Sequence, residues 1–168
     1  AALREAKRAG CRVLSVVNVV GSTIATESDD VLYTWAGPEI SVASTKAYST
    51  QLAVIYLLAL YIGEQLGKFT QEQLSAYIAA LEKLPEQIDE MLKHKENIQF
   101  FASKYFNASD MYFIGRNVDY AASLEASLKL KEISYIHSEA YAAGELKHGP
   151  ISLIEDGTLV IALATDAR

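Results

Sequence analysis

The sequence contains a single cysteine, Cys11, among its 168 residues. One cysteine cannot form an intrachain disulfide, and it cannot supply the several thiolates of a cysteine-rich zinc site. The chain therefore has neither a disulfide framework nor a thiolate metal cluster. This composition favours a reduced, cytoplasmic setting.

The chain also lacks an excess of basic residues and a long hydrophobic run. Fifteen Lys and Arg face 21 Asp and Glu, for a formal charge of −6, which argues against the clustered basic surface that nucleic acids require. The apolar stretch 52–62 ends at Gly63 and is well short of the roughly 18 residues of a membrane span. We expect it to be part of an interior helix, buried on nearly all sides. No basic segment with a cleavage site begins the chain. We expect neither a nucleic-acid nor a membrane partner.

Hydrophobic residues make up 51% of the sequence, which is ample for a core at this length. Apolar β-branched runs bounded by turn residues predict strands, and periodic apolar residues predict helices between them. The predicted strands span 11–20, 31–35, 111–114 and 158–165, and the predicted helices span 1–8, 41–63, 70–84, 86–106 and 119–135. The sequence Thr70-Gln-Glu-Gln73 is a capping-box pattern, so we expect the helix 70–84 to start there. Strands alternating with helices are typical of an α/β fold with a parallel sheet.

The stretch 124–150 mixes many charged residues with core-forming ones. In the predicted helix 119–135, Glu125, Lys129 and Glu132 occupy positions i, i+4 and i+7, so two carboxylates and an amine share one face. Such a row can perform general acid and base chemistry. The alternative is a solvated face, on which a Glu–Lys pair contributes only a few tenths of a kcal/mol.

The end of this stretch is a predicted turn. Gly144, Gly149 and Pro150 punctuate it and would present Lys147 and His148 beside the charged helix. A metal site is a second interpretation of the histidines, because His137 and Glu139 lie just before the turn. Their spacing relative to His148 follows none of the familiar helical ligand patterns, so we expect no metal.

A second polar stretch, 37–47, precedes the apolar run. Ser44, Thr45 and Lys46 are expected in the first turn of the helix 41–63, where hydroxyls and free backbone N–H groups can bind an anion or a sugar hydroxyl. Ser44 or Thr45 could equally serve only as the helix cap.

Arg116 lies in the turn between the predicted strand 111–114 and the predicted helix 119–135. It could meet a phosphate there, but we favour a solvated side chain because no Gly-rich phosphate loop surrounds it.

Both polar stretches resemble one known family. The string KEISYIHSEAYAAGELKHGP, residues 131–150, is similar to a signature of the sugar-isomerase (SIS) module of glucosamine-6-phosphate synthases, and GPEISVASTKA, residues 37–47, resembles the same family. The resemblance extends through essentially the whole chain and is least distinctive between the two strings. It implies a three-layer αβα sandwich with a parallel, flavodoxin-like sheet.

The resemblance also implies a domain organisation. The family has two SIS modules in tandem, and this chain would contain incomplete parts of both, joined by helices. Residues 1–66 would be the later part of the first module, 67–106 a helical linker and 107–168 the early part of the second. In the family a Ser- and Thr-rich phosphate loop, a C-terminal Schiff-base lysine and an N-terminal glutaminase domain complete the enzyme, and none of them matches these 168 residues. We therefore expect this fragment to be inactive.

By resemblance, the parent enzyme makes glucosamine 6-phosphate from fructose 6-phosphate and glutamine, combining ketose-to-aldose isomerisation with amino transfer. Glu132 would be the base that moves a proton between neighbouring carbons, Lys129 would move protons on the sugar oxygens, and Glu125 would support both. His148 would open the sugar ring and reach the site of a neighbouring subunit, which implies a homodimer with the turn 144–150 at its interface. The family requires no metal and no organic cofactor.

Sugar binding in the family uses the positions that match Val42 and Ser44. Two other functions stay open on the sequence. One is a related SIS-domain sugar-phosphate isomerase or deglycase. The other is a non-catalytic sugar-phosphate-sensing module, which could keep Ser44 but would have no need of Glu132 or His148.

Overall fold

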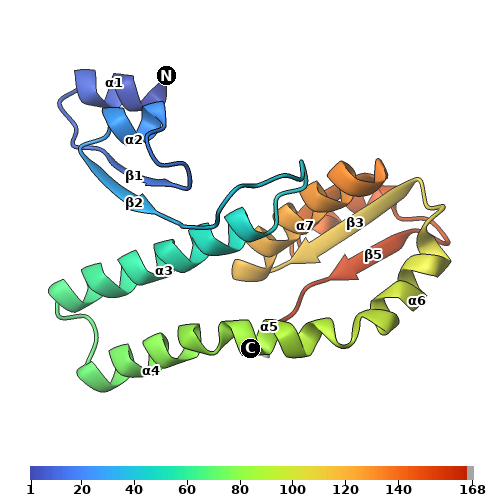
Figure 1. The fold of residues 1–168 in the computed structure, drawn as a ribbon. Helices are drawn as coiled ribbons and strands as arrows, with labels where there is room; N and C mark the ends of the chain where they lie inside the picture. Colours follow the sequence, from blue (N-terminus) through green and yellow to red (C-terminus); the bar gives the residue numbers. More distant parts are fainter. Residues whose placement is uncertain (166–168) are drawn as a thin grey trace. The chain divides into compact units, whose positions relative to one another are not determined.

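The computed structural model describes residues 1–165, and the chain divides into two compact units, Ala1–Glu90 (unit 1) and Met91–Arg168 (unit 2). Each unit contains a parallel sheet with flanking helices (Figure 1), which confirms the predicted α/β class. The boundary between the units lies inside the expected linker 67–106, and the assignment of two tandem modules remains a prediction. Among residues 1–165, no helix combines the length and apolarity needed to cross a bilayer.

Unit 1 begins with a small parallel two-stranded sheet. Its elements are α1 (Ala2–Arg8), β1 (Leu14–Val17), α2 (Thr23–Glu27), β2 (Asp30–Tyr33), α3 (Lys46–Gln65) and α4 (Gln71–Glu82). In the sheet Leu14 pairs with Asp30 and Val17 with Tyr33. The predicted strand 11–20 is too long, because β1 pairs with only one short neighbour and the chain turns at Gly21.

Ion pairs and a backbone hydrogen bond hold the start of unit 1 together. The Arg4 guanidinium lies 2.7 Å from Glu27 and lowers the pKa of that carboxyl. The Arg12 guanidinium lies 2.7 Å from Asp30 and lowers the pKa of the Asp30 carboxyl. The backbone N–H of Val13 donates to Asp29 and lowers its pKa. Carboxylates from α2 and the start of β2 are thus favoured in their charged form.

We expect unit 1 to lose stability in acid for this reason. Glu27, Asp29 and Asp30 have a lower pKa in the folded than in the unfolded chain, so their contribution is complete above the unfolded pKa of about 4 and is lost as the pH falls through the lower folded value. Thermal unfolding followed by Trp35 emission should give a Tm that falls below pH about 4. An Arg12→Gln variant should show a smaller fall, and an identical fall would contradict the assigned cause.

The helix α3 differs from its prediction in two ways. It begins at Lys46 and not near residue 41. It was also expected to be buried on nearly all sides, yet only Gly63, beneath the Phe69 ring, is buried, and Ile55 is 52% exposed. The physical reason is that the two-stranded sheet of unit 1 covers little of a 20-residue helix.

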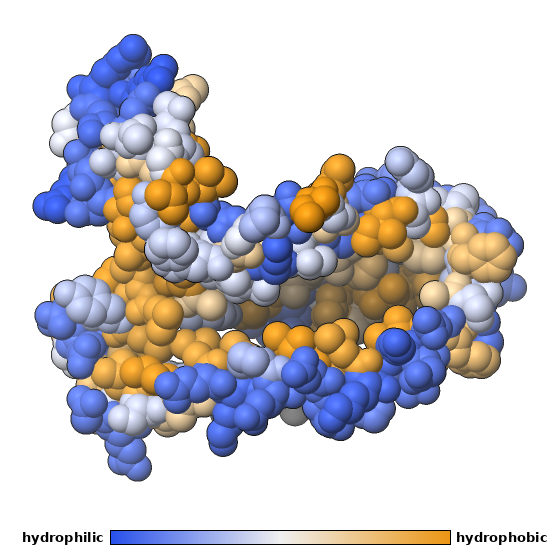
Figure 2. Space-filling view, viewed as in Figure 1, coloured by the Kyte–Doolittle hydropathy of each residue, from blue (hydrophilic) through white to orange (hydrophobic). Residues whose placement is uncertain are grey.

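A capping box starts α4 as predicted, since Thr70 and Gln73 exchange side-chain and backbone hydrogen bonds. Apolar side chains gather on the α3–α4 hairpin (Figure 2). They line a groove made by Tyr56, Ala59, Leu60, Phe69, Tyr77, Ala80, Leu81 and Leu84. The hairpin is therefore held by apolar contacts between its two helices.

The single helix predicted over 86–106 is two helices, α5 (Leu84–Leu92) and α6 (Lys95–Tyr105). The backbone leaves the helical region at His94, where φ is −97° and ψ is 19°. His94 N–H instead closes a tight turn onto the carbonyl of Met91. The apolar periodicity runs through this interruption, which is why the sequence did not reveal it.

Unit 2 is built on a three-stranded parallel sheet in the order β4-β3-β5, of which β3 and β5 are labelled in Figure 1. Its elements after α6 are β3 (Asp110–Gly115), α7 (Val118–Ser134), β4 (His137–Ala142), the short 3-10 helices η1 (Leu146–His148) and η2 (Pro150–Leu153), and β5 (Leu159–Ala162). The strand β4 was not predicted, because its polar, alternating sequence acquires strand structure only by pairing with β3.

The contact between α7 and the sheet includes buried polar side chains. The buried residues of α7 are Asp119, Ser123 and Ser127, which are spaced four residues apart. Ser127 Oγ lies 3.0 Å from Ser138 Oγ of β4, and the Ser138 hydroxyl donates to the carbonyl of Ser127 at 2.8 Å. Short polar side chains let the helix approach the sheet closely and fix its rotation. The charged residues Glu125, Lys129 and Glu132 are therefore on the opposite face of α7.

Candidate active site

The row predicted on α7 exists. Lys129 Nζ lies 2.6 Å from a Glu132 carboxylate oxygen and 3.6 Å from a Glu125 carboxylate oxygen. All three side chains are half-buried. They lie on the side of the helix opposite the buried residues Asp119, Ser123 and Ser127, because helical periodicity places the two sets on different faces. One ammonium thus bridges two carboxylates on a single helix.

The Glu132 hydrogen bond raises the pKa of Lys129, while partial burial opposes that shift. The ammonium therefore stays protonated at neutral pH and screens the two carboxylates from each other. In this arrangement Glu132 is an available proton acceptor, and Lys129 is a proton donor within hydrogen-bonding distance of it. The geometry fits general acid and base work on a small molecule at the exposed side of the row.

The residue His148 ends η1, and its side chain is exposed. Gly149 follows it with a φ of 136°, a conformation that favours glycine, and Pro150 begins η2. The predicted turn is therefore present and displays the imidazole. Within residues 1–165, no hydrogen bond or ion pair joins His148 to the row on α7.

Val42 and Ser44 belong to unit 1 and lie in the loop between β2 and α3. Val42 is 89% exposed. Ser44 precedes α3, so its predicted place in the first helical turn is wrong; Thr45 is the N-cap residue and its side chain makes no capping hydrogen bond. Instead, a Glu39 carboxylate oxygen accepts from Ser44 Oγ at 3.3 Å and from the backbone N–H of Ala47 at 3.4 Å.

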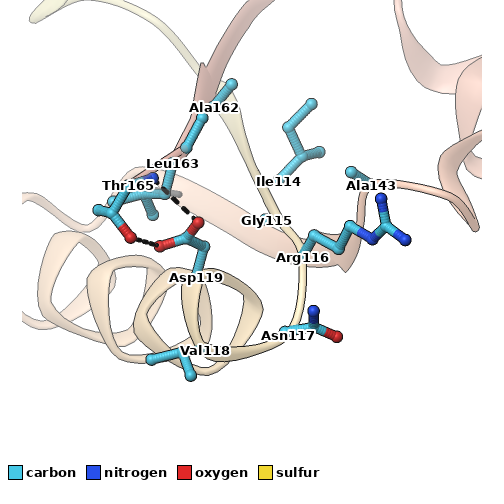
Figure 3. A pocket seen from close by; sticks show the side chains of 11 residues that line it. Ile114, Gly115, Arg116, Asn117, Val118, Asp119, Ala143, Ala162, Leu163 and Thr165 are labelled. Atoms are coloured by element: carbon cyan, nitrogen blue, oxygen red, sulfur yellow. Dashed lines mark hydrogen bonds between the residues drawn. The ribbon is translucent and has the colours of Figure 1, made fainter. Parts of the chain in front are cut away.

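A cavity of about 420 Å³ opens at the carboxyl end of β3 and β5, beside the start of α7 (Figure 3). The buried Asp119 carboxylate accepts from the backbone N–H of Thr165 at 3.0 Å and from its hydroxyl at 2.6 Å. Arg116 is exposed at the edge of this cavity. Sequence reasoning missed Asp119 and Thr165 because 46 residues separate them.

A second group of ionisable side chains lies on β3 and β4. His137 Nδ1 lies 2.9 Å from Asp110 and Nε2 lies 3.8 Å from Glu139. A hydrogen bond from Ser109 lowers the pKa of Asp110, and a hydrogen bond from His137 lowers it further by a smaller amount. The Tyr141 hydroxyl donates to Glu139, which raises the pKa of Tyr141 to about 12.

Within residues 1–165, no group of three or more His, Cys, Asp or Glu side chains is arranged to hold a metal ion. The contact of His137 with Asp110 joins the start of β4 to the start of β3, where the two residues are also partners in the sheet.

Comparison with known proteins places this geometry in context. The C-terminal domain of glucosamine-fructose-6-phosphate aminotransferase from Francisella tularensis superposes with a TM-score of 0.93 at 36% identity, over 96% of this chain and 45% of that chain. A glutamine–fructose-6-phosphate aminotransferase (isomerizing) from Caldanaerobacter subterraneus is 58% identical over 98% of this chain. The enzyme of that name from Methanosarcina mazei is 47% identical over the full 168 residues.

This chain spans only 27% of the length of either curated relative. The model of the SIS domain matches two segments, residues 1–61 and 104–168. The first segment contains the loop with Val42 and Ser44, and the second contains the α7 row and His148. Since the matched segments make up most of the sequence and the parallel sheets agree with them, the chain belongs to the SIS-domain family.

Proposed function

We propose that this chain is part of an enzyme that converts fructose 6-phosphate and glutamine into glucosamine 6-phosphate, in the cytoplasm. The relatives that carry this activity in their names support the proposal. The observation that carries it is the row on α7, where Lys129 bridges Glu125 and Glu132. The chemistry of the row matches the central step of the reaction.

That step moves a proton between two neighbouring carbons of a sugar phosphate. A carboxylate placed over both carbons can take the proton from one and return it to the other. Glu132 is assigned this role. Lys129 donates to, and recovers protons from, the sugar oxygens as their charge changes. Glu125 holds the ammonium from its other side.

His148 is assigned the opening of the sugar ring. Its exposed position at the end of η1 supports a role in the site of a neighbouring subunit. The partner in this proposal is therefore a second copy of the chain, with the turn 144–150 at the contact. Val42 and Ser44 are assigned to sugar binding by their match to the family's sugar-binding positions. The hydrogen bond from Ser44 Oγ to Glu39 supports the assignment of Ser44, because it orients the hydroxyl just before α3.

A calorimetric titration with fructose 6-phosphate and glucosamine 6-phosphate tests the proposal. We expect saturable binding at millimolar concentrations or better, and a Glu132→Gln variant should change the affinity because it removes the charge beside Lys129. A Glu155→Gln variant is the matched control, since Glu155 is an exposed carboxylate of the same unit outside the α7 row.

The outcomes separate the parts of the proposal. Binding that Glu132→Gln leaves unchanged would contradict the role of that carboxylate. A folded chain that binds neither sugar phosphate would show that these 168 residues do not form the substrate site by themselves. An equal change in the Glu155→Gln control would mean that net charge, and not the α7 row, governs binding.

A further inference from the structure

Trp35 is the only tryptophan in the chain, and it has a backbone φ of 54°. A positive φ is a genuine outlier for a bulky residue, because the side chain crowds the backbone, and it persists only where surrounding contacts hold it. The indole is nevertheless 78% exposed. Burial of the side chain therefore does not compensate for the backbone strain.

The contacts that hold this conformation come from Asn18. Its side-chain amide donates to the carbonyl of Gly37 at 2.6 Å, and its carbonyl oxygen accepts from Thr34 Oγ1 at 3.1 Å and from the backbone N–H of Ala36 at 2.9 Å. These three bonds anchor the chain on both sides of Trp35. The backbone is thus held in a conformation that displays the indole.

Trp35 lies in the same loop as Ser44. It lies two residues after Tyr33, the last residue of β2, at the carboxyl end of the strand, where parallel α/β proteins bind ligands. Further along the loop, Lys46 Nζ donates to the carbonyl of Pro38 at 2.7 Å, and Glu39 accepts from Ser44. Hydrogen bonds therefore order the loop from Trp35 to the start of α3.

A second ring extends the aromatic surface. The Tyr33 ring centroid lies 5.6 Å from that of Trp35, at an interplanar angle of 52°. Tyr33 is the last residue of β2 and Trp35 lies two residues later. The two rings form an aromatic surface whose Trp35 side is open to solvent.

We infer that Trp35 is a platform on which the sugar ring of a phosphorylated hexose or hexosamine stacks. The C–H face of a sugar is apolar and carries a slight positive charge, and it complements the negative face of an indole. Ser44 provides a directional hydroxyl at the other end of the loop. This inference rests on the proposed function, and it assigns recognition of the ring to a residue that the α7 chemistry does not use.

Fluorescence tests the inference directly, because Trp35 is the sole tryptophan. The chain is titrated with glucosamine 6-phosphate, fructose 6-phosphate and inorganic phosphate while Trp35 emission and its quenching by acrylamide are followed, with calorimetry in parallel. We expect both sugars to change the emission with the midpoint seen by calorimetry and to protect the indole from acrylamide. Inorganic phosphate should leave the emission unchanged.

Variants separate stacking from a structural role. Trp35→Gly should weaken sugar binding about tenfold while leaving Tm no lower than that of the parent, because glycine adopts the positive φ without strain. Trp35→Phe keeps an aromatic face and should stay within about threefold of the parent affinity. Tyr61→Ala removes an exposed ring of α3 and is the matched control, with unchanged affinity.

Three results would overturn the inference. Calorimetric binding with unchanged emission and an unaffected Trp35→Gly variant would remove Trp35 from the site and leave the proposed function intact. Absence of calorimetric binding by either sugar would overturn the inference for this chain, because it would show that Trp35 and Ser44 do not hold a sugar without the rest of the substrate site. Protection from acrylamide that grows with protein concentration in the absence of sugar would assign Trp35 to a contact between copies of the chain.

Discussion

Replacing Gly115 by alanine is expected to destabilise unit 2 by about 3 kcal/mol, which is at the upper end of the cost of overpacking. A Cβ at this position would lie 2.4 Å from the carbonyl carbon and oxygen of Asp119 and 2.6 Å from the backbone nitrogen of Tyr120. These are backbone atoms of the first turns of α7, so no side-chain rotation can relieve the clash. The helix itself would have to move away from β3.

Urea unfolding followed by circular dichroism measures this loss. Gly144→Ala is the matched control, because a Cβ there meets nothing within 4 Å and the backbone has no positive φ. The control should change the free energy of unfolding by no more than about 0.5 kcal/mol. Equal stability of the Gly115→Ala and Gly144→Ala variants would contradict the close packing of α7 on β3.

The second large effect is expected for Asp119→Ala, which should destabilise unit 2 by about 3 kcal/mol. The Asp119 carboxylate is buried and accepts two hydrogen bonds from Thr165. Hydrogen bonds to a charged acceptor contribute about 1.5–3 kcal/mol each, and deletion leaves the backbone N–H of Thr165 without this acceptor. Thr165 would lose both of these hydrogen bonds to α7.

Two variants give this experiment its controls. Asp119→Asn keeps one acceptor oxygen and an amide that can donate to the Thr165 hydroxyl, so it should lose less than half as much stability. Asp156→Ala removes an exposed carboxylate of the same unit and should be close to neutral. The interpretation fails if Asp119→Ala unfolds at the same urea concentration as Asp156→Ala.

The sequence predicted the features that depend on neighbouring residues. The spacing of Glu125, Lys129 and Glu132 places three side chains on one helix face wherever that helix lies, because the helical period alone determines it. The capping box at Thr70 is equally local, since its two bonds lie within one turn. The roles assigned to His148, Val42 and Ser44 came from resemblance and stay predictions.

The remaining features depend on contacts between distant segments, which local patterns do not encode. β4 is a strand because β3 lies beside it, and its polar sequence carries little strand propensity of its own. Asn18 holds the loop of Trp35 from 19 residues away, and Asp119 binds Thr165 from 46 residues away. Helical periodicity was therefore sufficient to place Glu125, Lys129 and Glu132 on one face of α7. Only the tertiary structure, through strand pairing and long-range hydrogen bonds, decided how β4 joins the sheet, how closely α7 packs on Gly115 and how the Trp35 indole is held exposed.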